Sequence, residues 1–152
     1  MSKPVRATRV EPFYLDLQQR VEAWLGSEEA RRFPCAHLYR FLPSLYLFLV
    51  RVAVDARVPA RERSAASSVL KYIVSPYDLI PEAVFGTSGF RDDLVLAALM
   101  VDRLHGLVEP QVLAELWQAP GDPQVIAHTI LDASSALVGP ELCGRLRAWL
   151  PE

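Results

Sequence analysis

Four acidic side chains, Asp78, Glu82, Asp92 and Asp93, lie close together in the sequence and are the best candidates for chemistry in this chain. Four carboxylates supply enough oxygen ligands for magnesium or calcium if water completes the shell, and such a site would permit metal-assisted hydrolysis. Acids beside prolines and helix starts are also common as helix caps. We prefer the capping interpretation, so no cofactor is predicted, and a divalent metal held by these four residues is the alternative.

The elements around these acids predict a proline-rich corner between two helices. Ser75-Pro76 and Ile80-Pro81 each stop a helix, because proline lacks an amide donor and disfavours helical geometry at the residue before it. Asp78 can accept hydrogen bonds from the freed amides. Asp92 and Asp93 fall in the first turn of the next helix, where the helix dipole favours negative charge. We expect these acids to fix the angle between two core helices.

The same stretch carries a longer motif, SPYDLIPE, followed after a glycine-containing spacer by GFRDDLVLAAL. It resembles the hallmark of the YkvA-like proteins, a bacterial family defined by the DUF1232 domain of unknown function. The matching positions are Ser75, Pro76, Asp78, Leu79, Ile80, Pro81, Glu82, Gly89, Asp92 and Asp93. The sequence departs from the pattern at Glu82, where aspartate is commoner, and at Phe85, where a further proline would be expected. Neither departure removes an acid.

The likeness covers roughly residues 44–115. It implies a helical, bacterial, often membrane-associated protein with no established activity. The residues alone argue against a membrane-spanning helix, because every apolar run is interrupted before the ~20 residues that span a bilayer. Phe41–Val50 contains a proline and is bounded by arginines, and Leu94–Val101 ends at an aspartate. With no apolar leader at the N-terminus, we expect a cytoplasmic protein that is soluble or peripherally membrane-associated.

Helical periodicity and prolines at helix starts predict the fold class. The expected helices are 12–25, a short one after Ser27, 43–56, 59–74, 90–107, 110–118, 122–137 and 140–150. The chain of 152 residues, 51% of them hydrophobic, is therefore expected to form a single compact all-α domain of six to eight helices. Within 1–152 we distinguish an N-terminal helical arm (1–34), the YkvA-like core (44–115) and C-terminal helices (116–152). Helices 43–56 and 90–107 are apolar on nearly all sides, so both should be central.

Charge is divided unevenly along the chain. Residues 1–74 carry twelve basic against seven acidic residues, a net +5, and residues 75–152 carry four against eleven, a net −7. Seven arginines fall in one region: Arg31, Arg32, Arg40, Arg51, Arg57, Arg61 and Arg63. A phosphate or nucleic-acid partner would use such a region. We prefer pairing between the two halves, within the fold or across an oligomer, so a nucleic-acid partner is disfavoured.

Other catalytic or metal-binding arrangements have no support. His37, His105 and His128 are isolated from one another, and Cys35 and Cys143 lack the spacing of a zinc site or disulfide framework. No nucleophile elbow is present, so nucleophilic catalysis is not predicted.

These observations leave three classes of function. We favour a non-enzymatic helical interaction or adaptor protein that binds a protein partner or a second copy of itself. A contact with the inner membrane surface would use the exposed side of helix 43–56 or the aromatic residues Trp24, Tyr39, Tyr46 and Trp149. The alternatives are a metal-dependent hydrolase built on Asp78, Glu82, Asp92 and Asp93, and a phosphate or nucleic-acid binder acting through Arg31–Arg63.

Overall fold

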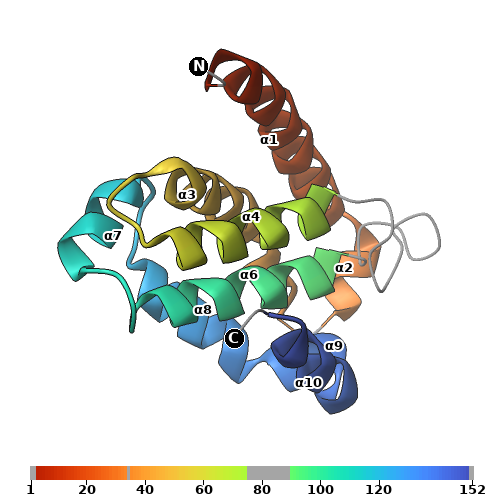
Figure 1. Cartoon of the computed structure of the whole chain (residues 1–152). Helices are drawn as coiled ribbons and strands as arrows, with labels where there is room; N and C mark the ends of the chain where they lie inside the picture. The colour runs from red at the N-terminus through yellow and green to blue at the C-terminus, as the bar shows by residue number, and fades with distance from the viewer. Residues whose placement is uncertain (1–2, 34, 75–89, 151–152) are drawn as a thin grey trace.

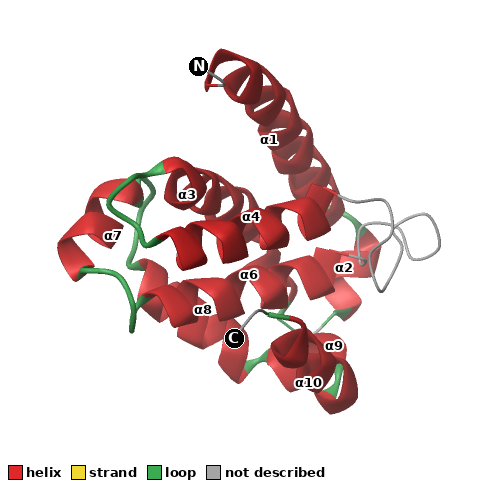
Figure 2. Ribbon diagram, in the orientation of Figure 1, coloured by secondary structure: helices red, strands yellow, loops and turns green. Residues whose placement is uncertain are grey.

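The computed structural model describes residues 3–33, 35–74 and 90–150, and this part of the chain is helical, without a strand (Figure 1, Figure 2). The all-α class is thereby confirmed. The described residues form nine α-helices, seven of them with at least seven residues, and one 3-10 helix. The elements are α1 (Lys3–Leu25), α2 (Glu28–Arg32), η1 (Ala36–Phe41), α3 (Leu42–Val54), α4 (Ala60–Val74), α6 (Phe90–Leu104), α7 (Pro110–Leu116), α8 (Pro123–Asp132), α9 (Ser134–Val138) and α10 (Pro140–Trp149).

Helix α1 begins nine residues earlier than expected, at Lys3, and runs through Pro12. The prediction that Pro12 starts this helix was wrong. Proline lacks one amide hydrogen bond, but its ring holds φ near the helical value, so the backbone on either side can remain helical at a cost in stability. Figure 1 shows the N-terminal half of α1 standing clear of the other helices. Its C-terminal half buries Leu17, Val21 and Trp24 against the body.

The segment after α1 contains one helix that was predicted and one that was not. Ser27 caps α2, since its Oγ accepts a hydrogen bond from the Ala30 amide at 3.3 Å, as the sequence predicted. The 3-10 helix η1 was not predicted. It follows Cys35, whose φ of 61° lies in the left-handed region. This turn directs the chain so that Leu38 and Tyr39 enter the core.

Helices α3, α4 and α6 form the centre of the molecule. Helix α3 packs along α4, and both contact α6. Every residue from Leu94 to Val101 is buried, as expected for a run that is apolar nearly all round. Small side chains at the interfaces, among them Ala65, Ala66, Ala97 and Ala98, are fully buried and let the helices approach closely. The most extensive neighbour of α6 is α8.

One helical stretch, made of η1 and α3, is rich in apolar residues. Within the described residues, Ala36–Val54 is long and apolar enough to cross a membrane by length and composition, with a mean hydropathy of 1.2. It comprises η1 and α3, and half of it is buried inside the protein. Arg40, Pro43 and Arg51 lie within this stretch, so its apolar run is interrupted as predicted. The core helix of a folded domain can have the same length and composition, so this stretch is weak evidence for a membrane span.

The C-terminal third contains four short helices. The expected helix 122–137 is divided at Ala133, whose ψ of 1° is not helical, into α8 and α9. Helix α6 ends at Leu104 rather than 107. Prolines occupy the first positions of α7, α8 and α10, as predicted.

Candidate functional site

The candidate site begins at the first turn of α6, where Asp92 and Asp93 both have 0% exposed surface. Two adjacent carboxylates without solvent contact are unusual, because burying a charge is costly unless other groups satisfy it. Tyr72, near the end of α4, donates a hydrogen bond from its hydroxyl to Asp92 Oδ2 at 2.8 Å. The site therefore joins α4 to α6.

A second tyrosine approaches from η1. Tyr39 is fully buried, and its ring centroid lies 4.6 Å from that of Trp24. Burial is the main cause that raises the pKa of the Tyr39 hydroxyl; the Arg91 guanidinium opposes this shift, and the carboxylates of Asp92, Asp93 and Glu29 add to it. Tyr39 is therefore close enough to these acids to interact with them electrostatically.

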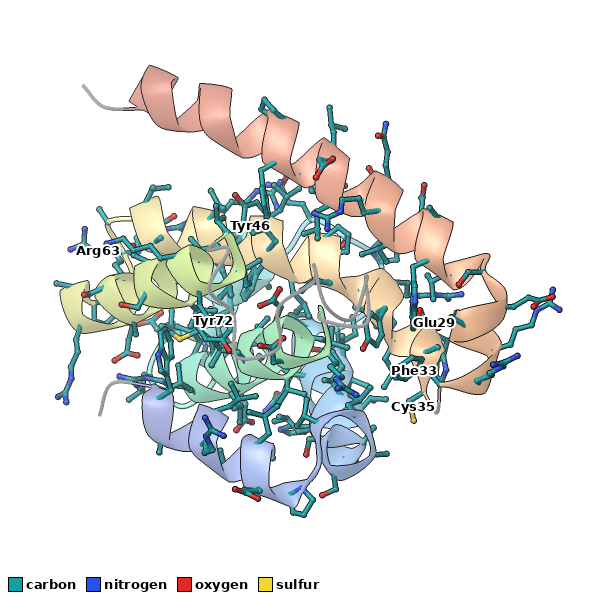
Figure 3. All side chains as sticks on the ribbon, turned by 90° about the vertical axis from the view of Figure 1, so that its right-hand side faces the viewer. Glu29, Phe33, Cys35, Tyr46, Arg63 and Tyr72 are labelled. Atoms are coloured by element: carbon teal, nitrogen blue, oxygen red, sulfur yellow. The ribbon has the colours of Figure 1, made fainter. Side chains whose placement is uncertain are left out.

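We call Tyr39, Tyr72, Asp92 and Asp93 the tyrosine–aspartate cluster. Its outer side is covered in part by α10, because the ring of Trp149 meets that of Tyr72 edge to face at 5.2 Å. Figure 3 shows Tyr72 projecting from α4 towards the interior. Five elements thus contribute to this cluster or pack against it: α1, η1, α4, α6 and α10. Tyr39, Asp92 and Asp93 are buried, and Tyr72 is partly buried.

Asp92 and Asp93 lie in the first turn of a helix, as predicted, but neither tyrosine was predicted to belong to this site. A signal was present, because a tyrosine in an apolar helical run needs a partner for its hydroxyl once it is buried. Asp78, Glu82 and the motif residues from Ser75 to Gly89 lie outside the described residues. Their convergence with Asp92 and Asp93 stays a prediction. Within the described ranges, no group of three or more His, Cys, Asp or Glu side chains is arranged to hold a metal.

The proposed aromatic anchors are corrected by the structure. Trp24, Tyr39 and Tyr46 are 5%, 0% and 4% exposed, so they belong to the core and are not available to a membrane. They are buried because they pack against other rings; Tyr46, for example, lies 4.9 Å from Phe13. Trp149 is 41% exposed and remains accessible.

Several charged side chains of the two halves pair with each other. Arg57 binds Asp55 and reaches Glu115 on α7, and hydrogen bonds from its guanidinium lower the pKa of both carboxyls. Arg103 on α6 binds Glu62 on α4, with Nε and Oε1 2.7 Å apart. Arg31, Arg32 and Arg40 are exposed at the surface. The preferred interpretation, in which the halves pair within the fold, is thus supported at Arg57.

Two histidines and one cysteine have hydrogen-bond partners within the fold. His128 Nε2 lies 2.9 Å from Asp102 Oδ1, and His105 Nδ1 lies 2.9 Å from the Val101 carbonyl oxygen. Both cysteines are free thiols, and the Cys143 thiol donates to Ser134 Oγ.

The fold and site define a helical domain centred on α3, α4 and α6, with the tyrosine–aspartate cluster at the start of α6. Residues 62–99 of this domain match the model of the family described as "Protein of unknown function (DUF1232)". The matched segment begins in α4, ends in α6 and includes Tyr72, Asp92 and Asp93, which confirms the resemblance found in the sequence. No curated protein and no solved structure matches the chain.

Proposed function

We propose that this chain is a non-enzymatic helical interaction protein, and that the tyrosine–aspartate cluster is the architectural centre of its DUF1232 segment. The observation that carries the proposal is the complete burial of Asp92 and Asp93. A carboxylate that handles a substrate must be reached by it. Here the Asp92 carboxylate instead accepts a hydrogen bond from the side chain of a neighbouring helix.

The energetics of burial support an architectural role. Moving a carboxylate out of water costs several kcal/mol, and hydrogen bonds to the charged form offset that cost only if the donors are held in place. Tyr72 on α4 is such a donor for Asp92 on α6. The cluster therefore favours one arrangement of α4 relative to α6, the two helices that precede and follow residues 75–89.

An interaction protein also needs an accessible anchor. Among the large apolar side chains that are exposed in the described residues, Trp149 is the aromatic one. Aromatic residues are enriched at protein interfaces. Since Trp149 also contacts Tyr72, a protein bound at Trp149 would lie next to the cluster. The expected partner is a protein, either of another kind or a second copy of this chain.

The architectural role can be tested by melting experiments. Tyr72→Phe removes one hydrogen bond to a buried charged group and should lower the free energy of unfolding by about 1–3 kcal/mol. Asp92→Asn keeps an acceptor oxygen and should cost less than Asp92→Ala. Adding magnesium or calcium to protein treated with a chelator should leave the melting temperature unchanged.

A metal site gives the opposite pattern. Either cation would then raise the melting temperature, and Asp92→Asn would abolish that increase as completely as Asp92→Ala. That result would replace our proposal by the metal-dependent hydrolase. Asp132 carries an exposed carboxylate at the end of α8. The substitution Asp132→Asn is therefore the matched control for loss of one negative charge.

The interaction role can be tested by placing a photo-crosslinking benzoylphenylalanine at position 149. Irradiation of cells that express this variant should give one discrete protein adduct, which the purified partner then reproduces. The same crosslinker at Val125, a residue of α8 that is 61% exposed, is the control position. Adducts of lipid, or binding to anionic vesicles that Trp149→Ala abolishes, would instead place this surface on a membrane. The absence of any adduct specific to position 149 would contradict the proposed anchor.

A further inference from the structure

A cleft of about 470 Å³ lies at the end of α6 opposite the tyrosine–aspartate cluster. The two sites are separated by the length of this 15-residue helix, roughly 22 Å. The cleft is formed by the turn after α6, by α7 and by the connection from α7 to α8. Figure 1 shows where α7 lies in the fold. Its principal lining residues are His105, Leu113, Ala114, Trp117, Gly121 and Asp122.

The walls of this cleft are held firmly by contacts behind them. Trp117 is only 8% exposed, and its ring packs edge to face against Phe48 of α3 at 5.5 Å. Its indole Nε1–H donates to the Gly121 carbonyl oxygen at 3.0 Å. Gly121 has a φ of +89°, and a Cβ at this position would lie 3.3 Å from Ile126 Cδ1. The cleft is therefore a preformed feature of the packing, as ligand sites usually are.

Two polar side chains on the cleft, those of His105 and Asp122, have acceptor capacity that no hydrogen bond within the described part of the chain uses. The carbonyl of Val101 can only accept, so the 2.9 Å contact requires the proton of His105 to be on Nδ1, which leaves Nε2 of the neutral ring as an acceptor. Asp122 caps α8 through Oδ1, which accepts from the Gln124 amide at 2.8 Å. Its carboxylate remains exposed and negatively charged.

The local charge favours a cation. Among the residues that line this cleft there is no lysine or arginine, and Asp122 is the acidic side chain. The C-terminal ends of α6 and α7 at Leu104 and Leu116 add partial negative charge. Two features disfavour a cation here. Arg51 Nη1 donates to the Leu116 carbonyl at 3.4 Å, and the N-terminus of α8, which carries partial positive charge, lies at the cleft. The charge at the start of α8 is partly offset, because its first amide, that of Gln124, already donates to Asp122.

We propose that this cleft binds an ammonium or guanidinium group carried on a small apolar body. The cation would be held by Asp122 and the Nε2 acceptor of His105, and the apolar part would pack against Leu113, Ala114 and Trp117. The volume is within the range of small-ligand sites, about 300–1,000 Å³. The cation can belong to a free amine or to a lysine or arginine side chain of a protein. The site lies outside the residues matched to DUF1232 and does not rest on the function proposed above.

The test uses the ¹⁵N-labelled full chain and follows the Trp117 indole signal, one of three tryptophan signals. Titration with 3-phenylpropylammonium should give a saturable shift of this signal, whereas the uncharged 3-phenylpropanol should bind about tenfold more weakly, the effect of one lost charge-assisted contact. A short acetylated Leu-Arg-Leu amide serves as the protein-derived probe. Tighter binding of the peptide than of the amine identifies a protein side chain as the source of the cation, and the reverse identifies a free amine.

Asp122→Asn provides a discriminating variant, because asparagine caps helices as well as aspartate does while removing the charge. It should fold normally and bind 3-phenylpropylammonium about tenfold more weakly. Asp132→Asn carries the same change in net charge at the far end of α8 and should bind as the unchanged protein does. Equal binding of amine and alcohol, equal binding by Asp122→Asn, or no saturable shift with either cationic probe would overturn the proposal.

Discussion

Replacing Glu62 by alanine should lower the free energy of unfolding by about 3–5 kcal/mol, because removing one partner of a buried ion pair leaves the other charge poorly solvated. The side chains of Glu62 and Arg103 are only 5% and 16% exposed, and they approach within 2.7 Å. Whole domains are stable by about 5–15 kcal/mol. A loss of this size should lower the melting temperature by roughly 10 °C in a chain of this length.

Two comparisons isolate the cause of this loss. The double variant Glu62→Met with Arg103→Met removes both charges, and it should lose less stability than Glu62→Ala alone, since no buried charge is left behind. Asp16→Ala breaks the exposed ion pair with Arg20 in α1, and this should lower the free energy of unfolding by less than about 1 kcal/mol. A cost for Glu62→Ala as small as that for Asp16→Ala would show that water reaches the Glu62 carboxylate.

The helices at the centre of the fold were predictable because a helix of their apolar composition is stable in water only when it is buried. A helix such as Leu94–Val101, apolar on nearly every side, must be surrounded by other apolar elements. Prolines marked the starts of α7, α8 and α10 because a helix loses nothing when its first amide is missing. The same reasoning gave a wrong helix start at Pro12, since a proline can also lie within a helix at a cost in stability.

The elements that were missed depend on tertiary packing. The 3-10 helix Ala36–Phe41 contains no proline or glycine to define its ends, and it is held in place by burial of Leu38 and Tyr39. The break at Ala133 similarly has no local signal: neither glycine nor proline lies there, and Ser134 and Leu137 of the following helix are buried. Intrinsic propensity is a weak guide wherever such contacts decide the backbone.

The candidate site was predictable only as a position in the chain. Asp92 and Asp93 were expected in the first turn of a helix, and they lie there. Their complete burial and the bond from Tyr72 follow from how α4 and η1 pack against α6, between residues that are far apart in the sequence. The Glu62–Arg103 pair was missed for the same reason, since its members are 41 positions apart.

Replacing Phe48 by alanine should lower the free energy of unfolding by about 3–5 kcal/mol, the usual cost of removing a large aromatic ring from a core. Phe48 is 0% exposed in α3, and its ring supports Trp117 at the end of α7. The measurement is chemical denaturation followed by circular dichroism. Phe48→Leu keeps most of the volume and should lose considerably less stability than Phe48→Ala.

The Phe48 change also has a local consequence that a general loss of stability would not produce. Without this ring, Trp117 loses the contact that supports it from within the core, so its near-ultraviolet circular dichroism and indole chemical shift should change in the folded protein. Val69→Ala removes apolar volume from α4, outside this contact, and is the matched core control. It should lower stability while the Trp117 signal stays in place. If Phe48→Ala leaves that signal unchanged, α7 is held against the body mainly by other contacts, such as the hydrogen bond from Arg51 to the Leu116 carbonyl.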